Sequence, residues 1–336
     1  ALFSGIAKLG ELRAMGRLVW RTLAFFVGTT VVAILIGLAV AVTLLPRVRL
    51  APQHQELLRA MTADSTLVER GAAAVRAGPR FIVELIPANP LREAVDFNLL
   101  PVIVFVTLFA VAAAMLPADK RAALTDLSDA ATDALIRIVH WVLVLAPAGI
   151  FALVAPFVAL IGWDAIRGMF WFIFVVILGL ALFMTLVYLP LVALMARVPP
   201  GRFLRIAFPS MLMGFSTTSS LATLPTMLQA AQHELRIPSP IAGFVLPLAA
   251  SLNRAGSALF QIVAVVFVAQ VYAVPFGAGT MLQAAVAVLL AAFTVASVPS
   301  ASVVSLVPAF ATTGLPIAGL TVLLGLDRIP DMFRTT

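Results

Sequence analysis

The sequence predicts an all-α protein whose helices cross a membrane several times. Hydrophobic residues make up 62% of its 336 residues and charged residues 11%, whereas a soluble domain has about 45–50% and about 25%. Uncharged runs at 22–45, 97–118, 138–163 and 168–196 each exceed the roughly 20 residues that a helix needs to span a bilayer. No charged residue occurs from 255 to 326, which is enough chain for about three crossings. We therefore expect a multi-pass bundle in the cell inner (plasma) membrane.

Charge and residue composition exclude several other classes of protein. The net charge of +7 lies in the segments between the apolar runs, as basic flanks of membrane spans do, so we expect no nucleic acid partner. There is no cysteine, and the three histidines fit no metal spacing, so no metal site is predicted. No phosphate-binding loop or dinucleotide fingerprint occurs. We therefore expect no cofactor and no enzyme.

The C-terminal part of the chain shows a repeated pattern of apolar segments. A mixed-charge connector at 119–133 is expected to precede it. A segment resembling a hairpin followed by a single helix occurs twice, as in a transporter built from inverted repeats. The expected elements are a hairpin at 203–232, a helix at 241–272 broken at 253–257, a hairpin at 281–312 turning near Val298 and Pro299, and a helix at 317–336.

Two polar clusters interrupt these apolar segments. The segment GFSTTSSLATLP at 214–225 holds five consecutive hydroxyl side chains, and irregular backbone at membrane depth must be buried by protein or line a cavity. It predicts a re-entrant hairpin around a polar ligand, or alternatively a Ser/Thr-rich face between packed helices. Asp327, Asp331 and Arg334 share one helix face by their spacing. They predict either a site for a charged ligand or an ion pair satisfied within itself, since Arg328 is also close in sequence.

Three ordered motifs resemble one known family. GFSTTSSLATLP, LPLAASLNRAGSALFQ at 246–261 and LGLDRIPDMFRTT at 324–336 are similar to the signature segments of the dicarboxylate/amino acid:cation symporters, which include sodium:dicarboxylate symporters and glutamate-transporter homologues. LIPANP at 85–90 also matches. The resemblance covers nearly the whole chain. It implies a fragment that lacks the first helices and the end of the last one.

The resemblance also implies an architecture and a function. Residues 1–196 would be mainly scaffold and oligomerisation helices with a polar loop at about 46–96, and residues 197–336 a transport domain that slides as an elevator. The implied protein is a homotrimeric secondary active transporter of acidic amino acids or dicarboxylates, such as aspartate or glutamate. A non-transporting receptor or an anion channel on the same fold is the alternative.

Family motifs can be carried over residue by residue. In the family, the residue matching Arg334 binds the side-chain carboxylate of the substrate, and the one matching Asp331 binds its amino group. The substrate-binding positions implied here are Ser219, Ser220, Ser257, Asp331, Arg334 and Thr335. The implied positions near the cation sites are Thr29, Thr30, Asn253, Arg254 and Asp327.

The chain departs from the family where the coupling ion binds. The family reads Asn-Met-Asp-Gly-Thr where this chain has Asn-Arg-Ala-Gly-Ser at 253–257, so Ala255 removes a carboxylate and Arg254 adds a cation. Phe26 also replaces a tyrosine. We therefore expect sodium dependence to be weakened or absent, with H⁺ or Na⁺ as the coupling ion, unless Arg254 extends to an interface. Glycines of the second hairpin tip are missing too, which predicts a stiffer gate.

Overall fold

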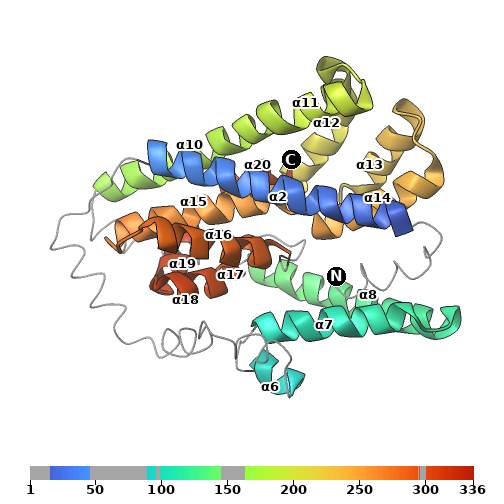
Figure 1. Ribbon diagram of the computed structural model, residues 1–336, viewed down its shortest axis with the longest axis horizontal. Helices are drawn as coiled ribbons and strands as arrows, with labels where there is room; N and C mark the ends of the chain where they lie inside the picture. The colour runs from blue at the N-terminus through green and yellow to red at the C-terminus, as the bar shows by residue number, and fades with distance from the viewer. Residues whose placement is uncertain (1–15, 46–88, 96–98, 145–162, 294, 296–299) are drawn as a thin grey trace.

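The computed structural model describes residues 16–45, 89–95, 99–144, 163–293, 295 and 300–336, and these residues form helices and turns but no strand. The expected all-α class is confirmed (Figure 1). The first helices are α2 (Gly16–Leu44), α6 (Pro90–Val95), α7 (Leu99–Ala114), α8 (Ala118–Val144) and α10 (Trp163–Phe183). The π-helical and α-helical segments that follow are η2 (Met184–Tyr188), α11 (Leu189–Leu191), η3 (Val192–Ala196), α12 (Pro200–Thr217), α13 (Leu224–Gln229) and η4 (Ala230–Glu234). The C-terminal helices are α14 (Ser239–Leu252), α15 (Ala255–Val271), α16 (Ala278–Ala292), α17 (Ala301–Val304), α18 (Val307–Thr313), α19 (Ala318–Leu326) and α20 (Arg328–Thr335).

Three helical segments of the described chain are long and apolar enough to cross a membrane. They are Trp20–Leu44, Arg167–Ala196 and Ile241–Val271, which matches the runs expected at 22–45 and 168–196. The run expected at 97–118 forms the shorter α7, which ends before Pro117 because the residue before a proline disfavours helical geometry. Most of the run at 138–163 and of the expected polar loop at 46–96 lies outside the described residues.

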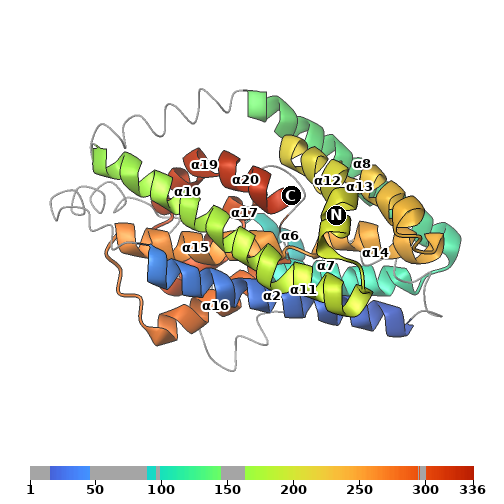
Figure 2. The ribbon, with the colours of Figure 1, turned by 90° about the horizontal axis from the view of Figure 1, so that it is seen from above.

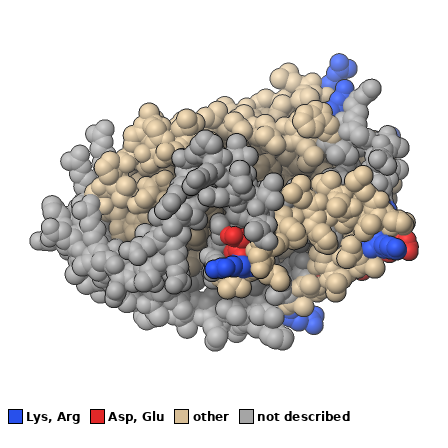
Figure 3. Space-filling model, turned by 60° about the horizontal axis from the view of Figure 1, so that its bottom comes forward, with Lys and Arg blue, Asp and Glu red and all other residues tan. Residues whose placement is uncertain are grey.

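Apolar side chains cover much of the outer surface of these helices. Large exposed examples on α2 and α10 include Trp20, Leu35 and Phe170. The face shown in Figure 3 carries few charged side chains, and most of its described surface is uncharged. A surface of this kind is stable against lipid and costly against water.

The connector expected at 119–133 is helical and belongs to the continuous helix α8. Alanine-rich sequence favours a helix, and Asp119 in the first turn interacts favourably with the helix dipole. Alternating charges therefore mark the exposed side of a helix here.

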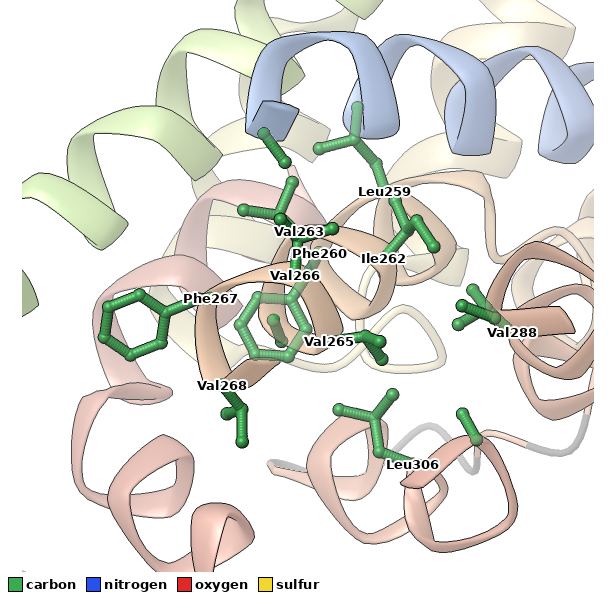
Figure 4. Packing of buried hydrophobic residues seen from close by; sticks show 14 of the residues in the cluster. Leu259, Phe260, Ile262, Val263, Val265, Val266, Phe267, Val268, Val288 and Leu306 are labelled. Carbon is green, nitrogen blue, oxygen red and sulfur yellow. The ribbon is translucent and has the colours of Figure 1, made fainter. Parts of the chain in front are cut away.

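Helix α15 forms the centre of the fold, with α2, α10 and α16 packed along it (Figures 1 and 2). It is buried over nearly its whole length. Figure 4 shows the buried side chains of α15 spreading from this helix towards α2 and towards Val288 and Leu306. A Cβ on Gly37 of α2 would lie 2.6 Å from Cγ2 of Ile262, so this glycine permits the close approach of the two helices.

The broken helix expected at 241–272 corresponds to α14 and α15. The interruption covers Asn253 and Arg254, so it is narrower than the 253–257 predicted from the motif. Asn253 is extended, with φ −80° and ψ 99°, which ends the hydrogen-bond ladder of α14. Ser257 already lies in the first turn of α15, where its side chain faces the same region as the break.

The first expected hairpin appears as a helix, a turn and a second helix. Helix α12 ends at Thr218, whose left-handed φ of 51° turns the chain, and α13 with η4 returns alongside α12. For the second, α16 and α18 pack against each other, while positions 294 and 296–299 lie outside the described residues. The helix expected at 317–336 is interrupted at Asp327, because Pro330 has no N–H to donate to the carbonyl of Leu326.

Candidate functional site

A cavity of about 200 Å³ lies where five segments meet: the end of α10 with η2, the break between α14 and α15, the turn after α12, the start of α17 and helix α20. Half-helix ends and unwound backbone of this kind form solute sites in membrane transporters. Seven of the residues expected at the substrate or cation sites line it: Ser220, Asn253, Arg254, Ser257, Asp331, Arg334 and Thr335.

The guanidinium of Arg334 binds two buried carboxylates. Its Nη1 lies 2.6 Å from Oδ1 of Asp327, and its Nη2 lies 3.1 Å from Oδ2 of Asp327 and 2.8 Å from Oδ1 of Asp331. Asp327 is 0% and Asp331 4% exposed. Because two carboxylates share one guanidinium, this cluster carries one net negative charge.

Neighbouring groups fix this cluster in place. The guanidinium of Arg334 lies 4.4 Å from the centroid of the Phe260 ring, a cation–π distance. The N–H of Ser300 donates to Oδ2 of Asp331 at 3.3 Å. A Cβ on Gly256 would lie 2.8 Å from the carbonyl oxygen of Arg334, so glycine allows the start of α15 to touch the backbone of α20.

The interpretation as an internal ion pair is confirmed in part. Arg334 pairs with both aspartates. Arg328 instead donates to Oγ1 of Thr218 at 3.3 Å, in the turn after α12. The two arginines of α20 therefore do different things: one neutralises buried acid, and the other contacts the first hairpin.

Arg254 places a second buried guanidinium at the same cavity. It occupies the break between α14 and α15, only 8% exposed, and its Nη1 donates to Oγ of Ser220 at 3.4 Å. It does not extend to an interface, so the alternative of a side chain reaching the membrane surface is wrong. Ala255 beside it is buried and carries no charge.

A chain of hydrogen bonds joins α15 to the segment after the second hairpin tip. Oγ of Ser302 donates to Oγ of Ser257 at 3.0 Å. Nε2 of the fully buried Gln261 donates to the carbonyl of Ser302 at 3.0 Å and to Oγ of Ser305 at 2.7 Å. The hydroxyl at Ser257 is therefore already bound by protein in this conformation.

The residues expected near a cation divide between two places. Thr29 and Thr30 are buried on α2, and their hydroxyls donate to backbone carbonyls of the preceding turn. The hydroxyl of Tyr188 interacts with Thr29 and accepts from Nδ2 of Asn253 at 3.5 Å, so it links α2 to the helix break. Asp327 lies apart from these groups, against Arg334.

One expected substrate residue lies outside the cavity, and two unpredicted residues contact the site. Ser219 lies in the turn after α12, where its Oγ accepts from the N–H of Ala222 at 3.4 Å, and it does not line the cavity. Tyr188 and Phe260 both contact site residues but were not predicted. A lone tyrosine in an uncharged span was the available signal for Tyr188, whereas nothing in the sequence distinguishes Phe260 from a core residue.

Together these features describe a helical membrane protein with a polar, charged cavity between broken helices, the construction of a secondary transporter. The chain belongs to the sodium:dicarboxylate symporter family, which it matches over residues 1–336. It is therefore a transporter rather than an enzyme.

Three relatives show how far this similarity extends. The proton/glutamate-aspartate symporter of Escherichia coli (strain K12) is 29% identical over 99% of this chain and 76% of its own length. The proton/sodium-glutamate symport protein of Bacillus subtilis (strain 168) is 28% identical over 100% of this chain and 77% of its own. The excitatory amino acid transporter 3 of Homo sapiens is 30% identical over 71% of this chain and 45% of its own.

Proposed function

We propose that this protein is a secondary active transporter that moves acidic amino acids or dicarboxylates across the cell inner membrane in symport with a cation. Relatives that carry glutamate or aspartate support the substrate class. In this proposal the two hairpins are re-entrant, the part at 197–336 moves as an elevator against the scaffold at 1–196, and three copies assemble. The observation that carries the substrate class is the buried Arg334, held by two aspartates at a cavity within the apolar bundle.

The roles of Arg334 and Asp331 follow from their chemistry. A guanidinium binds a carboxylate through two parallel hydrogen bonds, and a carboxylate is the natural partner of an ammonium. A substrate that brings both groups can therefore replace part of the Arg334–Asp331 pair, which is joined at 2.8 Å. The substrate carboxylate goes to Arg334 and its ammonium to Asp331.

The proposed coupling is weakly dependent on sodium or independent of it. Ala255 supplies no carboxylate, and the buried Arg254 puts a fixed positive charge beside Asn253. At about 5 Å and an effective dielectric near 20, one positive charge costs a bound sodium roughly 3 kcal/mol. A proton, or plain exchange of substrates, is then the driving reaction.

Uptake into liposomes tests this function. We expect radiolabelled aspartate to accumulate in proteoliposomes when a proton gradient is imposed, at a rate that changes little when external sodium replaces potassium or choline. A receptor gives binding without uptake, and an anion channel gives current without accumulation against a gradient. Steep sodium activation would contradict the coupling but leave the transport function intact.

Asp331 is expected to separate amino acids from dicarboxylates that lack an amine. Asp331→Asn keeps the shape of the side chain but loses its charge, so it weakens aspartate more than malate, because only aspartate brings an ammonium. A difference of about tenfold or more corresponds to one charge-assisted hydrogen bond. Competition of both ligands against labelled substrate measures it. Equal losses for the two ligands would mean that Asp331 acts only through Arg334.

A further inference from the structure

We propose that Arg254 is a second carboxylate-binding residue, so that one guanidinium serves each carboxylate of the substrate. The inference rests on the proposed transport of acidic substrates and adds a ligand to the same site. It makes the cavity selective for molecules with two carboxylates. Figure 1 shows the two elements concerned, the junction of α14 with α15 and the C-terminal helix α20.

Arg334 has too few N–H donors to bind two substrate carboxylates by itself. A guanidinium has five N–H donors, and three of the contacts of Arg334 go to oxygens of Asp327 and Asp331. The two donors that remain, Nε–H and one Nη1–H, lie on opposite edges of the guanidinium, so a substrate carboxylate makes two parallel hydrogen bonds to Arg334 only where it displaces an aspartate oxygen. Two carboxylates bound bidentately need four donors, which Arg334 cannot supply while it also holds Asp327 by two contacts, so a second cationic group at the cavity suits a substrate with two carboxylates.

Arg254 lies where it can bind the second carboxylate. It lines the same cavity as Arg334 and Asp331, and its Nη1 is 3.4 Å from Oγ of Ser220, so it faces the turn after α12. Burial strengthens its interaction with an anion, because a charge of opposite sign is screened less in a low-dielectric site than in water.

The positive charge of Arg254 balances the net negative charge of the other buried ions at the site. Asp331 is the only acidic residue among the described residues that line the cavity, and it lies 2.8 Å from Nη2 of Arg334. With Asp327 behind it, the cluster of two acids and Arg334 carries one negative charge, which Arg254 balances. The site is thus neutral before an anion arrives, so an incoming anion meets no net repulsion.

The test compares aspartate with its two monoamides, asparagine and isoasparagine. Each monoamide replaces one carboxylate by an uncharged group of nearly the same shape, so the loss of affinity measures what that carboxylate contributes. Calorimetry with the purified full chain gives the three affinities, with competition against aspartate for weak binders. In the wild-type protein we expect each amide to bind about 10- to 100-fold more weakly than aspartate.

The variant Arg254→Met should abolish one of these two penalties. Aspartate affinity falls about 10- to 100-fold, one monoamide then binds as well as aspartate, and the other keeps its penalty. Arg254→Lys keeps the charge without the planar fork, so it should give an intermediate loss. The matched control is Arg205→Met, which removes an exposed arginine of α12 outside the cavity and should leave all three affinities unchanged.

Two results would overturn the inference, and they differ. If both monoamides keep their full penalties in Arg254→Met and in Arg254→Lys, Arg254 binds neither carboxylate, while the proposed transport stands. If the wild-type protein binds neither aspartate nor malate nor succinate, the proposed function fails together with the inference. Unfolding temperatures of all variants show whether a loss of binding reflects a loss of fold.

Discussion

Arg334→Ala is expected to abolish binding of acidic substrates and to destabilise the protein. The substitution removes the only described partner that joins Asp327 to Asp331, and it leaves two buried carboxylates close together. Removing one member of a buried ion pair costs about 3–5 kcal/mol. The remaining double negative charge also repels an incoming dicarboxylate. Calorimetry with aspartate, glutamate, malate and succinate should show no binding, and the unfolding temperature should fall.

A double variant separates these two effects. Asp327→Asn with Arg334→Gln removes one charge of each sign, so the net charge of the cluster stays as in the wild type. We expect it to recover much of the lost stability, because Asp327 no longer carries a buried charge without a partner. Binding should remain absent, since no guanidinium of α20 is left at the cavity. Wild-type affinity for all four acids in either variant would remove Arg334 from the substrate site.

Helix periodicity was enough to predict which residues of α20 and its N-terminal flank lie together. Asp327, Asp331 and Arg334 fall on one side of any helix, and an ion in an apolar span needs a partner or a cavity. The uncharged runs likewise predicted α2 and the long helix at 163–196, and the polar Asn253 and Arg254 predicted the helix break. These features depend on local sequence, so they are visible without a structure.

Contacts between distant segments were not predictable in the same way. The hydrogen bond between Ser302 and Ser257, and the ring of Phe260 beneath Arg334, join residues 45 and 74 positions apart in the chain. The sequence could place Arg254 at the break but could not say whether its side chain turned into the cavity or towards a membrane surface. That choice depends on how α12 and α20 pack against α15. It decides the chemistry of the site.

Substitution of Arg254 and Ala255 at the helix break gives the second large expected effect, a change of coupling ion. Arg254→Met together with Ala255→Asp restores the motif to the family pattern and shifts the local charge by two units. Sodium affinity should rise by roughly two orders of magnitude for each positive charge removed, or negative charge added, at about 5 Å. Uptake by the double variant should then be activated by sodium above the rate in potassium or choline. Because the variant also lacks the proposed carboxylate contact of Arg254, uptake is compared at saturating substrate.

Other groups near the break determine how complete this rescue is. Oδ1 of Asn253 is buried with no hydrogen-bond partner among the described residues, which leaves it free to bind a cation beside the introduced carboxylate. Phe26, 3% exposed and packed on Leu248 and Leu252, offers no oxygen, so adding Phe26→Tyr should strengthen the sodium response further. Each single substitution at 254 or 255 should give a smaller response than the pair. Uptake that stays indifferent to sodium in the triple variant would show that Arg254 and Ala255 do not set the coupling ion, and that the protein excludes sodium by other groups.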